Sequence, residues 1–488
     1  MIYEWPLLGR FLNRVDDRAR IEDWWQRSDR FLALYGRRRV GKSWLFRSVA
    51  HGKPTLILVA RQVAEATTLD EFATALEPHL GLRPDLRTLP DLIRVLFRAA
   101  RAEKLLVVID EFPRLLPAHA SGRLVALQGM AAVIEEEQDQ SNLKLIVCGS
   151  HVAMMESLLS DTLDGKENPI KGRLEGLPVR PLSFWDAREF LSGLDPVEML
   201  ERFAIAGGTP RYLVDLGQGE LIATLCREVV DPRSALFNEP LDILAQEVRE
   251  SRVYFSILEQ LASGAKKMDS LATALKRDQS SLTQYLDALQ AMKLIEKRRP
   301  LGATANSRST SYRLADPFFR FWFRFVFPFQ EDLAAGLIPE AHFRSAVIPD
   351  LADHVANTFE EICTQWTRHN YGERAQQFGA WWGNARNDLR QTGERTSEEI
   401  DIVGMQRNRV TIVGECRWRN DRMDVNVLKE LGEFKIPALE QGGLKPAADH
   451  IKLLFSRGGF SDGLRNAANS DSSLVLVAVD ELIDLTRP

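Results

Sequence analysis

The chain of 488 residues is too long for one hydrophobic core, so its length predicts two to four domains. Its hydrophobic content of 45% is ordinary for a globular protein, and its formal net charge of -5 excludes a uniformly basic protein that coats nucleic acid. Four well-separated cysteines, no membrane-length apolar run and no leader-like N-terminus predict a cytoplasmic protein without disulfides, zinc or membrane contact.

The first 180 residues alternate short apolar runs with helical periods. Four runs are apolar nearly throughout, which is typical of strands buried on both faces of a parallel sheet: Phe31–Tyr35, Pro54–Val59, Leu105–Ile109 and Leu143–Cys148. Helices are expected between them, including Thr68–Leu80 and Leu89–Ala102. Residues 1–180 are therefore predicted to form an α/β domain.

A phosphate-binding pattern follows the first of these strands. The segment GRRRVGKS fits GxxxxGK[ST] and leads directly into a helical segment. Gly36 and Gly41 let the loop turn its N–H groups inward, where they and the helix N-terminus bind phosphate oxygens. Lys42 is expected to neutralise the β- and γ-phosphates of ATP, and Ser43 to bind Mg²⁺. The expected cofactor-binding set is Gly36, Arg37, Arg38, Arg39, Val40, Gly41, Lys42 and Ser43.

Two later strand ends supply candidates for ATP hydrolysis. The strand LLVVID ends in Asp110, which is expected to reach Mg²⁺, and Glu111 follows as the residue that polarises the attacking water. The strand LKLIVC is followed by Gly149 and Ser150, and Ser150 is expected to orient water near the γ-phosphate. These residues predict an ATPase.

In the middle of the chain, a helical stretch without predicted strands is followed by a segment that contains strands again. Residues 181–249 predict a small helical lid, with helices at Phe184–Ser192, Met199–Ala206 and Pro210–Leu216. Residues 250–330 predict a winged helix-turn-helix followed by an aromatic linker. Its elements are three helices, Tyr254–Ala262, Ser270–Leu275 and Ser280–Met292 with Ser280 or Ser281 as N-cap, and two strands, Leu294–Arg299 and Ser311–Leu314.

Basic residues on this module suggest contacts with DNA phosphates. The wing region carries Lys293, Lys297, Arg298, Arg299 and Arg308. The third helix has no Lys or Arg, so few contacts to base edges are expected from it, through Ser281 and Gln284, and a purely structural or protein-binding role stays open. The linker ADPFFRFWFRFVFPF predicts a core helix or interdomain clamp, with a base-stacking platform as the alternative.

Residues 350–488 predict a second α/β domain with the order α-β-β-β-α-β. Three carboxylates fall on its first elements: Glu360 on the helix, Asp401 on the second strand and Glu415 on the third. Carboxylates on adjacent strands can chelate Mg²⁺ beside a scissile phosphate. The sequence therefore predicts a metal site here.

Several motifs in this order resemble the archaeal-type ATPase family, a branch of P-loop NTPases close to AAA+ and STAND proteins. They are FLNR, GRRRVGKS, VVIDEF, IVCGS, KGR, GGTPRYL and DPFFRFWFRFVFP. The resemblance implies an adenine-side role for Phe11, Asn13 and Arg14. It also implies that Arg173 is an arginine finger or γ-phosphate sensor, and that Arg211 is a lid-domain sensor. A finger supplied by a neighbouring subunit would require a homo-oligomer.

The last domain resembles the PD-(D/E)xK nucleases, a restriction-endonuclease-like fold that recurs at the C-terminus of this ATPase family. One position departs from the pattern: Glu-x-Lys is replaced by Glu415-Cys416-Arg417. A guanidinium is a planar fork whereas an ammonium is a compact point charge, so the departure places nuclease activity in question.

Three functions remain open. The first is ATP-driven DNA processing or defence with an active nuclease-like domain. The second is a STAND-like switch whose C-terminal domain only binds, which Arg417 favours. The third is an ATP-responsive transcription regulator that uses the winged helix.

Overall fold

The computed structural model describes residues 13–28, 30–248, 251–264, 266–304, 309–386, 388–389 and 396–483, so Phe11 and Arg308 lie outside it. The chain divides into two compact units. Unit 1 comprises Met1–Leu182 with Thr209–Arg211, and unit 2 comprises Ser183–Gly208 with Tyr212–Pro488. None of the described helices is both long and apolar enough to cross a bilayer.

Unit 1 is built on a five-stranded sheet in which every neighbouring pair is parallel. Its order is β2-β3-β4-β1-β7, with β1 Phe31–Tyr35, β2 Thr55–Val59, β3 Leu105–Asp110, β4 Leu143–Gly149 and β7 Glu175–Pro178. The four predicted strands are confirmed to within a residue at each end. Strand β7 was not predicted, because the run EGLP contains Gly and Pro and has little apolar character.

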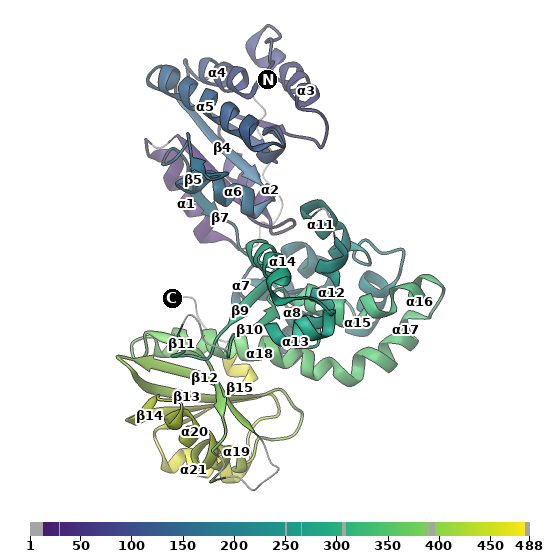
Figure 1. Ribbon diagram of the computed structural model, residues 1–488, viewed down its shortest axis with the longest axis vertical. Coiled ribbons are helices and arrows are strands. Elements are labelled where there is room, and N and C mark those ends of the chain that lie inside the picture. The colour runs from purple at the N-terminus through teal and green to yellow at the C-terminus, as the bar shows by residue number, and fades with distance from the viewer. Residues whose placement is uncertain are drawn as a thin grey trace. The chain divides into compact units, whose positions relative to one another are not determined.

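Helices cover both faces of this sheet (Figure 1), which is why its central strands read as continuous apolar runs. On one face lie α1 Val15–Gln26 and α2 Lys42–Ala50. On the other lie α3 Glu65–Leu80, α4 Leu89–Ala99, α5 Ala120–Glu137 and α6 Val152–Leu159. The short elements of unit 1 are η1 Phe112–Leu115, η2 Gln138–Gln140, β5 Thr162–Leu163 and β6 Lys166–Glu167.

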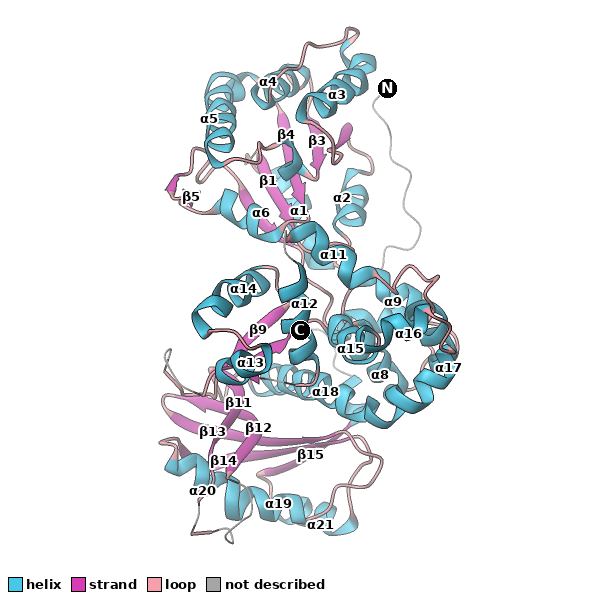
Figure 2. Ribbon diagram, turned by 45° about the vertical axis from the view of Figure 1, so that its right-hand side comes forward, coloured by secondary structure: helices cyan, strands magenta, loops and turns pink. Residues whose placement is uncertain are grey.

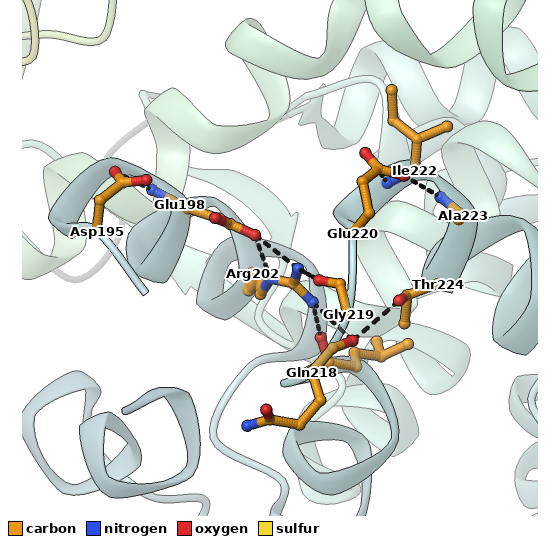
Figure 3. A network of polar contacts seen from close by, with 10 residues as sticks. Asp195, Glu198, Arg202, Gln218, Gly219, Glu220, Ile222, Ala223 and Thr224 are labelled. Carbon is orange, nitrogen blue, oxygen red and sulfur yellow. Dashed lines mark hydrogen bonds and ion pairs between the residues drawn. The ribbon is translucent and has the colours of Figure 1, made fainter. Parts of the chain in front are cut away.

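A run of short helices follows from residue 184, and one buried arginine links two of them (Figure 3). They are α7 Phe184–Ala187, η3 Arg188–Leu191, α8 Pro196–Ala206, α9 Pro210–Leu216, α10 Leu221–Leu225, the π turn Cys226–Val230 and α11 Glu239–Glu247. Arg202 of α8 has a fully buried side chain that pairs with Glu198 at 2.6 Å. It donates to the carbonyl of Leu216, the last residue of α9, at 2.6 Å and to that of Gly219. One guanidinium thus satisfies a helix C-terminus and the following loop.

Three helices and a three-stranded sheet follow, here called the hairpin module (residues 251–314). The helices are α12 Ser251–Ala262, α13 Met268–Leu275 and α14 Gln279–Ala291; the sheet order is β8-β10-β9, with β8 Lys266–Lys267, β9 Ile295–Arg298 and β10 Ser311–Leu314. The predicted N-cap of α14 was wrong. Asp278 holds that position, because its backbone is extended and its carbonyl already accepts the Leu282 N–H at 3.2 Å.

The aromatic segment forms α15 Pro317–Phe325 in the core of unit 2. All six of its aromatic side chains are at most 2% exposed: Phe318, Phe319, Phe321, Trp322, Phe323 and Phe325. The core-helix interpretation is therefore confirmed, and the rings are not available to stack on bases. The short helical elements η5 Phe327–Phe329, α16 Gln330–Ala334, α17 Pro339–His342 and the π turn Phe343–Val347 follow.

The C-terminal domain (residues 348–483) is a sheet of order β11-β12-β13-β14-β15 between two helical layers. Its first three strands are antiparallel and its last three parallel. The strands are β11 Gln377–Asn384, β12 Ser397–Gln406, β13 Arg409–Arg417, β14 Lys445–Ser456 and β15 Leu474–Ala478. Helix α18 Ile348–Tyr371 lies on one face (Figure 2); α19 Asn426–Glu430, the π turn Leu431–Lys435, α20 Ile436–Gln441 and α21 Asp462–Ser470 lie on the other, and α22 Val479–Ile483 ends the domain.

Candidate functional site

The segment between β1 and α2 wraps as a tight loop. Each of its two glycines is required for a different steric reason. A Cβ on Gly36 would lie 2.2 Å from the Val179 carbonyl oxygen, so the close approach of β7 admits only glycine. Gly41 has φ of 100°, in the region that disfavours a side chain, and it is the N-cap of α2. Arg39 also has positive φ, at 64°, and Arg37 and Arg38 are half-buried. The loop therefore has the strained geometry that phosphate sites use.

Lys42 begins α2 and is buried within this loop. Its Nζ donates to the carbonyl oxygens of Gly36 at 2.7 Å and Arg37 at 2.9 Å, and only 7% of the residue is exposed. Burial lowers the pKa of Lys42, whereas the nearby Asp110 and Glu111 carboxylates oppose that shift. The ammonium thus sits at the centre of the loop, among the charges expected around a nucleotide.

The strand order brings the catalytic candidates to one edge of the sheet. Because β4 lies between β1 and β3, and carboxyl ends of parallel strands share an edge, Ser150 lies between the phosphate loop and Glu111. Ser43 Oγ donates to Asp110 Oδ2 at 3.4 Å. Ser150 Oγ donates to Glu111 Oε2 at 2.9 Å, and its amide reaches the same oxygen at 3.4 Å. Two hydroxyl–carboxylate pairs therefore flank Lys42.

Arg14 braces the phosphate loop from the start of α1. It is 8% exposed, pairs with Asp17 at 2.9 Å, and donates to the carbonyl of Val40 in the loop and to that of Arg180 at 2.8 Å. Asn13 accepts the Arg14 backbone N–H at 3.1 Å. Arg14 thus contacts the loop backbone directly, and Asn13 contacts Arg14.

Arg173 and Arg211, the two other arginines to which the family resemblance gives a role, lie in different environments. Arg173 pairs with Glu135 of α5, and its side chain is 28% exposed. Arg211 is exposed and belongs to unit 1 with its neighbour Pro210. A Cβ built on Gly41 would lie 3.7 Å from Pro210 Cγ, so the segment that carries Arg211 packs against the phosphate loop.

The C-terminal carboxylates gather from three elements. The β12–β13 register pairs Ile402 with Gly414 and so sets Asp401 beside Glu415, while Glu360 comes from α18. Burial raises the pKa of Glu360 and Glu415 to about 8 and that of Asp401 to about 6, and Asp401 adds to the rise at both glutamates. Among the described residues, no group of three His, Cys, Asp or Glu side chains is arranged to hold a metal ion.

The two strand carboxylates each accept a hydrogen bond within the domain. Asp401 Oδ2 accepts the Cys416 N–H at 2.8 Å, and Glu415 Oε2 accepts from Lys435 Nζ at 2.5 Å. Glu415 Oε1, in contrast, is buried with no hydrogen-bond partner among the described residues. The donor set suits a hard divalent cation, but one oxygen of Glu415 is held by a lysine. Sequence reasoning did not find Lys435, and the expected Arg417 is exposed at the end of β13.

The hairpin module contacts the same region of the C-terminal domain. Leu301 N–H donates to the Ala380 carbonyl of β11 at 2.9 Å, and Trp382 Nε1 donates to the Ser309 carbonyl at 3.2 Å. The Arg298 guanidinium lies 5.5 Å from the Trp382 ring centroid, and it opposes the rise in the pKa of Glu360. Strand β9 therefore brings a cation close to the carboxylates.

Two protein families match this chain. Residues 11–216 match the family described as an ATPase domain predominantly from Archaea, and this range contains the phosphate loop and the Asp110 and Glu111 strand end. Over these residues the chain is similar to archaeal-type ATPase domains. Residues 322–429 match archaeal and bacterial proteins of unknown function, a range that includes Glu360, Asp401 and Glu415.

Individual relatives are similar over much of this chain. The uncharacterized protein MJECL04 of Methanocaldococcus jannaschii is 24% identical over 408 residues, which cover 82% of this chain and 85% of the relative. The Walker-type ATPase PABY2304 of Pyrococcus abyssi is similar in structure, with a TM-score of 0.50 and 22% identity over 64% of this chain and 96% of that one. The STAND protein PH0952 of Pyrococcus horikoshii, which has a tetratricopeptide repeat sensor, gives a TM-score of 0.29 and 12% identity over 76% of this chain and 51% of that one.

Proposed function

We propose that this protein binds ATP with Mg²⁺ and hydrolyses the γ-phosphate. The observation that carries the proposal is the pair of hydroxyl–carboxylate contacts at the carboxyl edge of the sheet, Ser43 with Asp110 and Ser150 with Glu111. Both pairs flank a glycine-bounded loop with Lys42 at its centre. Loop, cation, metal-binding pair and water-orienting pair are the parts that phosphoryl transfer to water requires.

Each side chain has a separate task in this reaction. Ser43 Oγ and Asp110 would hold Mg²⁺, which when bound spreads the charge of the phosphate oxygens. Lys42 exchanges its contacts with loop carbonyls for the β- and γ-phosphates. Glu111 orients the attacking water, and Ser150 holds the Glu111 carboxylate in place.

Lys42 gives the most direct test of nucleotide binding. Lys42→Ala should abolish most ATP binding, measured with a fluorescent ATP analogue, because it removes the cation at the phosphates. The matched control is Lys171→Ala, which removes a surface lysine paired with Asp161 at 3.0 Å. If circular dichroism shows that Lys42→Ala is folded and its ATP binding is unchanged, the proposed site is wrong.

We further propose that the nucleotide state of unit 1 controls nucleic-acid processing by unit 2. The hairpin module has the element order of a winged helix, and the turn between α13 and α14 borders an open hollow of about 700 Å³ that Lys276 and Arg277 help to line. These cations favour contacts with DNA phosphates over base recognition, because α14 has no Lys or Arg. The C-terminal domain brings together Glu360, Asp401 and Glu415, the carboxylates of the nuclease pattern, although among the described residues they are not arranged as a metal site.

A STAND-like switch with an inactive C-terminal domain is the second candidate. Two observations favour it: Lys435 donates to Glu415, and the described carboxylates are not arranged to hold a metal ion. Incubation of the purified protein with single- and double-stranded DNA and RNA decides between them, with and without ATP, Mg²⁺ and Mn²⁺. Cleavage supports the nuclease-like function, and ATP-dependent assembly without cleavage supports the switch. ATP-dependent, sequence-specific DNA binding would instead favour a transcription regulator.

A further inference from the structure

Arg38 lies at the turn of the phosphate loop. Arg38 and Arg39 together form this turn, and Arg39, whose φ is 64°, is exposed whereas Arg38 is half-buried. The turn therefore leaves one guanidinium in solvent and partly encloses the other. The carbonyl of Arg37, the residue before Arg38, accepts from Lys42 Nζ at 2.9 Å. The backbone that carries Arg38 is thus in contact with the buried ammonium at the centre of the loop.

The guanidinium of Arg38 has no ion pair or hydrogen bond to any residue that the structure describes. Carboxylates are present at the site, but each accepts from another group: Asp17 from Arg14, Asp110 from Ser43 and Glu111 from Ser150. An arginine that is removed from solvent is normally paired, because water no longer compensates its full charge. Arg38 is therefore a cation whose counter-ion is still to be supplied.

Arg38 also repels Lys42. Burial is the main reason that the pKa of Lys42 is lowered, and the charge of Arg38 lowers it further. Two cations held close together raise the free energy of the empty loop, and an anion that contacts both removes this cost. The loop favours anions in any case, since its N–H groups and the start of α2 carry partial positive charge. Loop and cations therefore favour the same ligand chemistry, a group with several negative oxygens.

Arg173 differs from Arg38 in this respect. The family resemblance gives Arg173 the role of arginine finger, but its side chain pairs with Glu135 of α5. Arg173 would have to leave that carboxylate to contact a phosphate, whereas Arg38 has no partner to leave. The phosphate loop therefore contains a guanidinium that is available without a second subunit.

We propose that Arg38 supplies, from the chain that holds the nucleotide, the guanidinium that stabilises the transferring γ-phosphoryl group of ATP. This inference rests on the proposed ATP hydrolysis. An arginine can serve this purpose when it belongs to the same chain, as well as when a partner provides it. The site of hydrolysis is then complete within one protomer, and Arg173 is not needed for turnover.

The step is hydrolysis of the bond between the γ-phosphorus and the oxygen that bridges it to the β-phosphate. The water oriented by Glu111 forms a bond to the γ-phosphorus, the bond to the bridging oxygen breaks, and ADP leaves with that electron pair. The water gives up a proton, which passes through the Glu111 carboxylate to solvent. The planar fork of Arg38 can donate to two of the oxygens on which charge develops. Arg38 stays protonated throughout, so it stabilises charge and transfers no proton.

The test compares Arg38→Ala and Arg38→Lys with a matched control, Arg20→Ala, in the full chain. Arg20 is an exposed arginine of α1 whose side chain likewise has no ion pair or hydrogen bond among the described residues. Arg38→Ala should lower kcat for phosphate release about 1,000-fold. Arg38→Lys should lower it about tenfold, because an ammonium is a point charge without the fork. Arg20→Ala should match wild type.

Three further measurements separate this role from a structural one. Affinity for ADP with aluminium fluoride, a mimic of the transferring phosphoryl group, should fall in Arg38→Ala about as much as kcat, whereas affinity for a non-hydrolysable ATP analogue should change less than about tenfold. Guanidinium chloride at non-denaturing concentrations should raise the kcat of Arg38→Ala about tenfold, and sodium chloride should not. Mixing Arg38→Ala with Lys42→Ala should restore no hydrolysis.

The outcomes distinguish this inference from the proposed function. If Arg38→Ala turns over like wild type, the role of Arg38 is overturned while ATP hydrolysis stands. If the ATP analogue loses as much affinity as kcat, Arg38 only binds the ground state, and hydrolysis restored by mixing would show that it acts on a neighbouring subunit; either result overturns the inference. If wild type releases no phosphate, the proposed function itself fails, and the role of Arg38 fails with it. Should Arg38→Ala not fold, a wild-type kcat for Arg38→Lys would refute the need for a guanidinium.

Discussion

The contact between Ser150 and Glu111 predicts that these residues act as one unit in ATP hydrolysis. Glu111→Gln removes the base that orients water, so kcat should fall by roughly 100- to 10,000-fold while ATP affinity is kept. The Ser150 hydroxyl makes a 2.9 Å bond to this carboxylate. A bond of this kind to a charged group contributes about 1.5–3 kcal/mol, and the Ser150 amide at 3.4 Å retains part of it. Ser150→Ala should therefore lower kcat about tenfold.

The double variant tests the coupling. If Ser150 acts only by holding Glu111, then adding Ser150→Ala to Glu111→Gln should cost almost nothing further, less than about threefold in kcat. Steady-state phosphate release and nucleotide affinity are measured for all four proteins. The control is Ser157→Ala, whose hydroxyl donates to the Met154 carbonyl at 2.7 Å. If the two losses in kcat multiply in the double variant, Ser150 and Glu111 do not act as one unit. Full turnover by Glu111→Gln would refute the role assigned to Glu111.

The remaining predictions concern oligomers, nucleic acid and stability. If Arg173 acts on a neighbouring subunit, activity per protomer should rise with concentration, and mixing Arg173→Ala with Lys42→Ala should restore some hydrolysis; flat activity without rescue contradicts this. DNA binding should show little sequence preference, and neutralising Arg298 and Arg299 should weaken it. In anisotropy titrations, the slope of log affinity against log salt concentration should also fall by about one for each phosphate that is no longer neutralised. An unchanged slope would exclude the hairpin module as the DNA surface. Arg202→Ala should destabilise unit 2 by about 3 kcal/mol in denaturant unfolding, since it leaves buried carbonyls unpaired; a change below about 1 kcal/mol would show that the network is dispensable.

The sequence predicted a site correctly where residues close together in the chain are enough to form it. The phosphate loop is such a case, because strand, glycine-bounded turn and helix follow one another within residues 31–50. The continuous apolar runs of β1, β3 and β4 likewise indicated a sheet covered on both faces. By contrast, β7 was not predicted, since its four residues include Gly and Pro and become a strand only by pairing with β1.

The contact between Lys435 and Glu415 could not be predicted from the strand pattern. The pattern directed attention to Arg417, two residues after Glu415, because alternation along a strand puts both on one face. The fold instead presents Lys435 from the opposite helical layer. One signal was present in the sequence: LGEFKIPAL places a lysine at an apolar period of the helix, just before a proline.

The sequence by itself determined the parts of the nucleotide site, since loop wrapping and strand ends depend on residues close together in the chain. It also indicated that β1, β3 and β4 are buried. For the aromatic segment, by contrast, the burial of the α15 rings was needed to decide between a core helix and a base-stacking platform. Tertiary structure alone decided that β4 lies between β1 and β3, which sets Ser150 against Glu111, and that a π turn aims Lys435 at Glu415. Strand order and contacts between layers depend on how distant segments pack, and the periodicity of a single segment carries no information about its neighbours in space.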